Sequence, residues 1–147
     1  MLDVTLAIAH HLLIFAIFGI VAVEFALVRP GISVARMAAV ARLDTRYGMV
    51  AGTIVIVGFS RAIFAAKGWD YYAHNGFFWA KMATFAAVGL LSIVPTRAYL
   101  RWNRAQHAPD DAGIARVQRF LTAQVVLFML LPVFAALMAR GYGEWTR

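Results

Sequence analysis

The sequence predicts an all-α integral membrane protein, a four-helix up-down bundle that crosses the bilayer four times. Of the 147 residues, 63% are hydrophobic, and the mean hydropathy of +0.73 exceeds what a soluble domain of this length needs for its core. The apolar residues gather in four runs, each near the 20 residues that cross the hydrocarbon layer; they are residues 4–28, 47–66, 77–96 and 117–139. Little chain remains outside them, so residues 1–147 are expected to form one membrane domain.

The first run is expected to be retained as a span rather than removed as a signal peptide. No Lys or Arg precedes Arg29, and the run is longer than a typical signal-peptide core. It stops at the helix-breaking Pro30 and Gly31. Residues 32–46 then carry apolar positions at helical spacing between arginines, which predicts a short interfacial helix between spans one and two. The second span is expected to begin near Asp44 or Thr45, and the side chain of either can cap it.

The second and third spans are joined by an aromatic and polar loop, residues 67–76. Trp and Tyr in such a loop suit the headgroup level of a membrane. The third run is expected to end near Pro95, with its helix continuing until residues 107–111 break it. Asp110 or Asp111 can then cap the fourth span.

The net charge of +7 is mostly a topology signal. The two loops that follow spans one and three hold nine arginines, whereas the opposite side holds only Lys67, Arg140 and Arg147; the nine are Arg29, Arg36, Arg42, Arg46, Arg97, Arg101, Arg104, Arg116 and Arg119. The positive-inside rule puts both termini on the outer side and the arginine-rich loops in the cytoplasm. The arginines favour anionic lipid headgroups over nucleic acid. Cysteine is absent, which excludes disulfides and thiolate chemistry.

Three ionisable residues, His10, Arg61 and Lys81, lie inside three different apolar runs. The helical rise puts each of them roughly 6–9 Å below the outer surface. Ionisable groups inside a bilayer are costly and usually face a partner, a ligand or a cavity. The alternative is that Arg61 and Lys81 extend separately to the headgroups. We expect a shared site, with Trp79 in its outer wall.

Two carboxylates, Glu24 and Asp44, lie near the opposite, cytoplasmic ends of the first two spans. Basic residues of the next segment, Arg42 and Arg46, are close by in sequence to Asp44. Structural ion pairs among these four residues are the favoured interpretation, with a proton-relay role for Glu24 as the alternative.

The number of histidines limits which cofactor the spans can hold. Only His10 and His11 lie within the apolar runs, both on one helix, so two bis-histidine haems are not available. One b-type haem remains available, with His10 or His11 as a ligand of its iron and a second ligand from His74, Lys81 or a methionine. Arg61 and Lys67 would pair with its propionates. A copper or zinc site would have to use the outer histidines and carboxylates, whose spacing is no recognised ligand pattern.

Polar residues at fixed places inside the apolar runs resemble a family of bacterial membrane proteins, domain of unknown function 2214. The residues that carry the resemblance are His10-His11, Glu24, Leu43-Asp44-x-x-Tyr47-Gly48, Gly58-x-x-Arg61, Lys67-Gly68-x-x-Tyr71-Tyr72, Phe78-Trp79-x-Lys81 and Pro95-Thr96. That family is distantly similar to HemJ-type protoporphyrinogen oxidases, whose span-one histidine and span-three lysine match His10 or His11 and Lys81. It is also similar in style to CopD-type copper-resistance membrane proteins.

The resemblance implies haem b, porphyrinogen oxidation, and electron transfer to a quinone or another respiratory-chain partner. We therefore expect a small multi-pass protein of the bacterial inner membrane, with periplasmic termini, that binds one haem or porphyrin for electron transfer or oxidation. If it is an enzyme, it is a haem-dependent oxidoreductase. The alternative is a non-enzymatic transporter or accessory subunit that binds a metal ion, an anion or a partner helix. The bilayer is the expected partner, and a homodimer is compatible with the chain.

Overall fold

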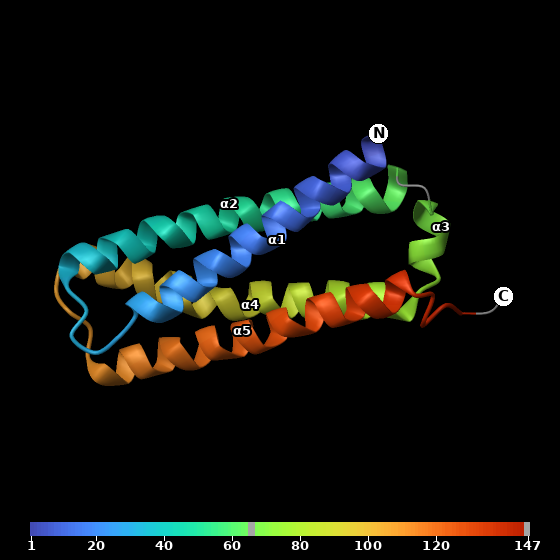
Figure 1. The fold of residues 1–147 in the computed structure, drawn as a ribbon. Coiled ribbons are helices and arrows are strands. Elements are labelled where there is room, and N and C mark those ends of the chain that lie inside the picture. The colour runs from blue at the N-terminus through green and yellow to red at the C-terminus, as the bar shows by residue number, and fades with distance from the viewer. Residues whose placement is uncertain (65–66, 146–147) are drawn as a thin grey trace.

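The computed structural model describes residues 1–64 and 67–145, and within these ranges it is helical (Figure 1). The helices are α1 (Leu2–Leu27), α2 (Val34–Phe64), α3 (Gly68–Ala73), α4 (Gly76–Ala105) and α5 (Asp111–Ala139). All except α3 are long and apolar enough to cross a membrane. The predicted all-α four-span architecture is therefore confirmed. Arg147 and the last two residues of the predicted second span, 65–66, lie outside the described ranges.

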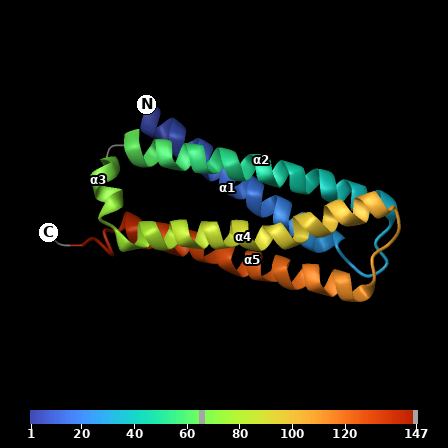
Figure 2. The same cartoon turned by 180° about the vertical axis from the view of Figure 1, so that it is seen from behind.

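The four long helices run alternately up and down, and the bundle has two distinct ends. Both termini and α3 lie at one end, which we call the terminal end (Figures 1 and 2). The α1–α2 and α4–α5 connections lie at the other, which we call the arginine-rich end. Helix α1 packs along α2, and α4 packs along α5. The sequence predicts this alternation because each connection is too short for anything but a neighbouring, antiparallel helix.

Residues 32–46 do not form a separate interfacial helix, which corrects the prediction. They supply the first turns of α2, which runs without interruption from Val34. The reason is visible in the burial: Met37, Val40, Ala41, Asp44 and Tyr47 are all buried. Their spacing of three or four continues one buried face toward the span, and no Pro or Gly lies between Val34 and Tyr47. Asp44 is consequently inside α2 and does not cap it.

The other helix boundaries follow the sequence signals. Helix α4 passes through Pro95 and ends at Ala105, ahead of the expected break. Asp110 caps α5, since its side chain accepts a hydrogen bond from the Gly113 N–H at 3.1 Å. Asn75 caps α4, since its side-chain oxygen accepts hydrogen bonds from the Phe77 and Phe78 N–H groups. Asn75 also pairs with Glu144 in an isolated bridge, which ties the C-terminal segment to the start of α4.

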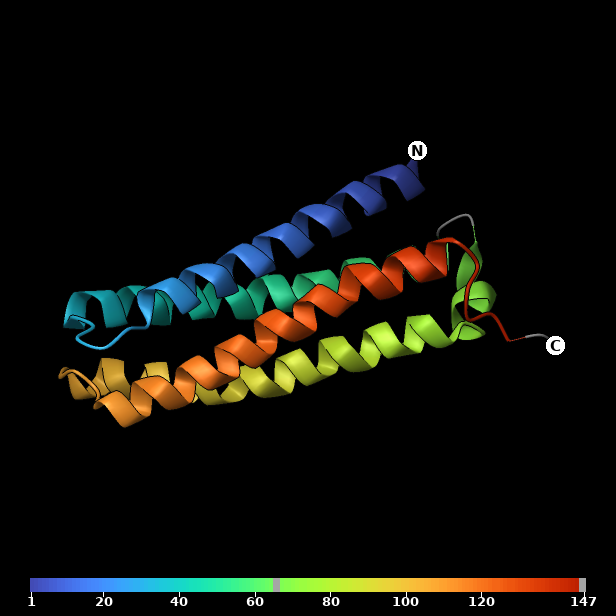
Figure 3. The ribbon, with the colours of Figure 1, turned by 60° about the horizontal axis from the view of Figure 1, so that its bottom comes forward.

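The packed core lies towards the arginine-rich end of the bundle. In α1 the buried residues are Ile17, Val21 and Glu24, so the first half of this helix contributes none. Figures 1 and 3 show the same asymmetry, because α1 diverges from α4 as it approaches its N-terminus. The side chains that converge around the core include Val40, Val88, Tyr99, Trp102, Val117, Leu121 and Phe128. The terminal end of the bundle is therefore the more open one.

Candidate functional site

The structure brings the three ionisable residues of the predicted outer layer together at the terminal end. His10 on α1, Arg61 on α2 and Lys81 on α4 are each partly buried. Both cations lie within electrostatic range of His10, and Arg61 lies within range of Lys81. The layer therefore contains one imidazole and two cations from three different helices.

The His10 ring lies against α2 at Gly58. A Cβ atom at Gly58 would be 3.2 Å from Cε1 of His10 and 3.6 Å from its Nδ1. Glycine allows this close approach because it has no side chain to displace the ring. The Nδ1 atom is buried and has no hydrogen-bond partner. Such an orphaned polar atom is unusual in a native structure and calls for an explanation.

The two cations of the layer have little acidic compensation. Nε of Arg61 lies 3.9 Å from Oδ1 of Asp3, in the first turn of α1. The Lys81 ammonium lies 5.6 Å from the centre of the Phe78 ring, and in the described ranges it forms no ion pair. The layer thus has more positive than negative charge in a partly desolvated position.

The other predicted haem-site residues are engaged elsewhere. His11 is exposed, and its Nδ1 lies 2.7 Å from the carbonyl of Ala7 in the preceding turn. His74 is exposed, with Nδ1 2.9 Å from the Asp70 carbonyl and 3.3 Å from its carboxylate. Trp79 donates to the Ala73 carbonyl at 3.0 Å. The His11 ring is exposed although its centre lies 6.4 Å from that of His10, while His74 and Trp79 of α4 hydrogen-bond to residues of α3.

Lys67, predicted to pair with a propionate, lies over the Tyr71 ring, with 4.0 Å between its ammonium and the ring centre. Hydrogen bonding to the Tyr71 side chain raises the pKa of this exposed lysine. Tyr71 in turn donates to the Met138 carbonyl at 2.8 Å. Tyr71 therefore fastens α3 to the end of α5, and Lys67 lies over its ring.

The structure contains a second polar cluster, near the arginine-rich end. Thr96 donates to Oδ1 of Asp44 at 2.9 Å, and Tyr99 donates to Oε2 of Glu24 at 3.5 Å. Because Thr96 and Tyr99 are three residues apart, they are neighbours on one face of α4. The two carboxyl groups that they contact are consequently close to each other, and each lies in the other's electrostatic environment.

The predicted ion pairs of these carboxylates are absent. Glu24 is 3% exposed and Asp44 is 8% exposed, whereas Arg42 and Arg46 are exposed on another face of α2. Within the described ranges, no ion pair joins either carboxylate to a basic residue. Positions two residues away point about 160° from Asp44 around a helix, so sequence proximity misled the prediction.

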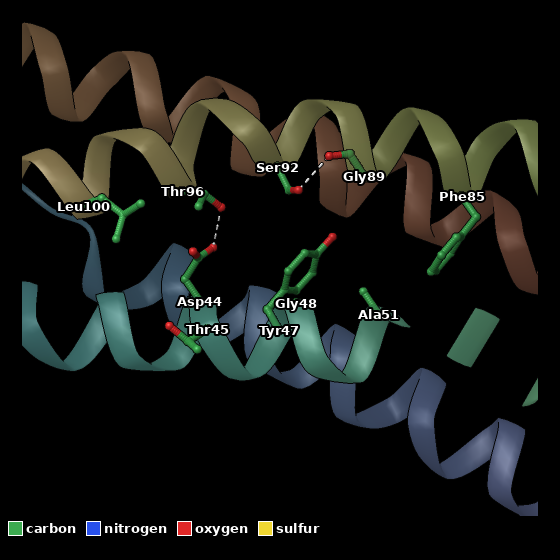
Figure 4. Close-up of a pocket in the computed structure, with 10 residues that line it drawn as sticks. All are labelled: Asp44, Thr45, Tyr47, Gly48, Ala51, Phe85, Gly89, Ser92, Thr96 and Leu100. Atoms are coloured by element: carbon green, nitrogen blue, oxygen red, sulfur yellow. Dashed lines mark hydrogen bonds between the residues drawn. The ribbon is translucent and has the colours of Figure 1, made fainter. Parts of the chain in front are cut away.

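A groove of about 350 Å³ between α2 and α4 adjoins this cluster (Figure 4). Asp44 and Tyr47 point into it from α2, and Ser92 and Thr96 point into it from α4, with Phe85 and Leu100 at its two ends. Phe85, Gly89, Ser92 and Thr96 are three or four residues apart, so they lie on one face of α4 and line the groove together.

These features define a four-helix membrane protein with one cationic and one acidic polar cluster. Residues 2–143 match the model of a family described as "predicted membrane protein (DUF2214)". The chain belongs to this family, domain of unknown function 2214, as the sequence pattern indicated. No curated protein and no solved structure matches it. No similarity to the HemJ-type or CopD-type proteins is shown.

Proposed function

We propose that the layer of His10, Arg61 and Lys81 binds one b-type haem or porphyrin, for electron transfer or oxidation. The observation that carries this proposal is the convergence of one imidazole and two poorly compensated cations from three helices. Haem b carries two propionates, and two cations at one level match that charge. We further propose that the protein lies in a bacterial inner membrane with periplasmic termini, from the arginine bias.

His10 is the residue that fits the haem iron. It is partly buried, faces α2 rather than lipid, and has a ring nitrogen without a partner. Unlike its neighbour His11, it is not committed to a backbone carbonyl. Metal-bound histidines usually donate their second ring nitrogen to an acceptor, and the buried Nδ1 of His10 has none. The chain therefore offers one imidazole ligand, and no hydrogen bond from its Nδ1 fixes the orientation of the ring.

Arg61 and Lys81 fit the anionic groups of such a cofactor. Arg61 is held by Asp3 at 3.9 Å, and this loose contact leaves guanidinium donors available for a carboxylate. Lys81 reaches the layer from α4 and is not paired with an acid in the described ranges. When bound, a haem of this kind supplies one-electron chemistry. The protein's own residues would fix its orientation and neutralise its charge.

The test is the visible spectrum of the protein after expression with ample haem and purification in detergent. We expect a Soret band in the wild type, its loss in His10→Ala, and its retention in His11→Ala. The second variant is a matched control, because His11 is the adjacent residue of the same helix but is exposed. Arg61→Ala and Lys81→Ala should weaken binding of metal-free protoporphyrin as well. Absence of a Soret band in the wild type, or a band unchanged in His10→Ala, would refute the proposal.

The second candidate is a non-enzymatic transporter or accessory subunit. It is favoured by a different observation, the acidic cluster at the arginine-rich end, which a haem at the terminal end would not use. A coloured membrane fraction favours the haem-binding function, whereas a colourless one favours the transporter or accessory subunit.

A further inference from the structure

We propose that Glu24 and Asp44 form a binding site for a small monovalent cation, a proton or Na⁺, reached through the groove between α2 and α4. The site is distinct from the layer at the terminal end. It does not depend on whether that layer binds haem.

The first argument is charge balance. The two carboxyl groups are neighbours in the interior of the bundle, held by Thr96 and Tyr99 of α4. The other titratable group facing them is Tyr47 of α2, and no described lysine, arginine or histidine forms an ion pair with either. Two adjacent buried carboxylates without a cation repel each other and lose hydration. A bound positive charge resolves both problems.

The second argument is an atom left without a partner. Glu24 is 97% removed from solvent, and its Oε1 has no hydrogen-bond donor. Burying an unsatisfied carboxylate oxygen costs several kcal/mol. Its other oxygen receives only the 3.5 Å contact from the Tyr99 hydroxyl, which is longer than the usual O–H···O distance of about 2.5–3.0 Å. The vacant position on Oε1 is where a proton or a small cation would bind.

The donor atoms select the class of cation. The side chains at the cluster and groove offer carboxylate and hydroxyl oxygens, the donors that hard cations prefer. Within the described residues, no group of three or more His, Cys, Asp and Glu side chains forms a metal site, which disfavours a transition metal. Ca²⁺ takes six to eight oxygens, which two carboxylates and two hydroxyls supply only if both carboxylates bind through both oxygens and the Thr96 and Tyr99 hydroxyls give up their present hydrogen bonds. A proton needs only one carboxylate oxygen, and a monovalent ion can bind between the two carboxyl groups without this rearrangement.

The groove supplies a route to the site. Asp44 lines the groove, whereas Glu24 is not among its lining residues and is the more deeply buried of the pair. Figure 4 shows Asp44 facing Thr96 across this opening, and the Tyr47 hydroxyl pointing toward Ser92 of α4. Exposed arginines, Arg42, Arg46 and Arg97, mark the same level of α2 and α4, which is the headgroup level of a membrane. A cation can therefore enter from the aqueous phase at the arginine-rich end.

The first arm of the test is for Na⁺. The thermal unfolding of the full-length protein in detergent is measured in NaCl and in choline chloride at equal ionic strength. If Na⁺ binds, the midpoint rises in NaCl for the wild type and for Asp111→Asn, an exposed acidic control. The rise should vanish in Glu24→Gln and in Asp44→Asn, which keep the shape of the side chains. A Na⁺ effect retained in both variants overturns the site.

The second arm is for the proton. The infrared band of a protonated carboxyl group is recorded at neutral pH for the same four proteins. If the site holds a proton, the band is present in the wild type and in Asp111→Asn and is lost in Glu24→Gln or Asp44→Asn. Tyr99→Phe should shift its frequency, which gives a readout even where one of the other variants does not fold. A wild-type protein with no Na⁺ response and no such band refutes the proposal. Neither result bears on the Soret test of His10, so the two proposals can fail separately.

Discussion

Replacing Asn75 by Ala should destabilise the protein clearly, although it leaves the apolar core intact. Asn75 is 0% exposed. Its side-chain oxygen accepts hydrogen bonds from the N–H groups of Phe77 at 3.0 Å and Phe78 at 3.3 Å. Its amide donates to the Tyr142 carbonyl at 3.0 Å. One side chain thus both starts α4 and holds the C-terminal segment against it.

The expected magnitude follows from these three bonds. Loss of an Asn cap costs about 1 kcal/mol, and loss of the bond to Tyr142 adds about 1 kcal/mol. The free energy of unfolding should therefore fall by about 2 kcal/mol in Asn75→Ala. The backbone bond from the Gly76 N–H to the Gly143 carbonyl, at 2.8 Å, remains and limits the loss.

Equilibrium unfolding in mixtures of mild detergent and dodecyl sulfate, followed by the helical circular dichroism signal, measures this difference. Asn103→Ala is the control, because Asn103 lies inside the same helix α4 and caps nothing. The control should change the unfolding free energy by no more than about 0.5 kcal/mol. If Asn75→Ala also stays within about 0.5 kcal/mol of the wild type, Asn75 does not both cap α4 and hold the C-terminal segment.

Three further predictions use the same unfolding measurement. Gly143→Ala should cost about 1–2 kcal/mol from its backbone alone, because φ is +79° there; its new Cβ would lie 2.5 Å from the Phe77 ring, so an unchanged stability would contradict the turn. Asp110→Ala removes one exposed cap bond and should cost about 1 kcal/mol, clearly less than Asn75→Ala. Lys67→Gln should destabilise the protein at neutral pH, because hydrogen bonding to Tyr71 raises the pKa of Lys67. The stabilisation from Lys67 is complete below the ordinary lysine pKa and is lost as the pH rises through the raised value. If the difference in unfolding free energy between wild type and Lys67→Gln grows with increasing pH, this assignment is wrong.

The fold could be predicted because a membrane leaves few choices. Runs of about 20 apolar residues form helices in lipid, since each backbone group must be satisfied within its own helix. The error at residues 32–46 has a clear cause. Arginines interrupt the apolar residues of this segment, a pattern typical of an amphipathic helix at the membrane surface. In the structure, the buried residues from Met37 to Tyr47 lie on one face that continues directly into the span. Helix α3 also escaped prediction, because six residues are too few to produce a periodic signal.

The site was predictable in part. Depth alone grouped His10, Arg61 and Lys81, because each residue's position in its span fixes its level. Which neighbour a side chain faces depends on how the helices are rotated, and sequence gives this only weakly. Asp3 as the partner of Arg61 and the pairing of Glu24 with Asp44 were missed for that reason. A signal for the acidic pair was the spacing of Thr96 and Tyr99, which puts two hydroxyl donors for carboxylates on one face of α4.

The two polar clusters lie at different levels of the bundle, and this separation has an electrical consequence. Fourteen residues of α1 separate His10 from Glu24, which is about 21 Å of helix against a hydrocarbon layer of about 30 Å. A charge that moved from one level to the other would cross about two-thirds of the membrane field. At 100 mV this is worth about 1.5 kcal/mol per charge. Charge transfer between the two levels would therefore be electrogenic, and its rate and equilibrium would follow the membrane potential.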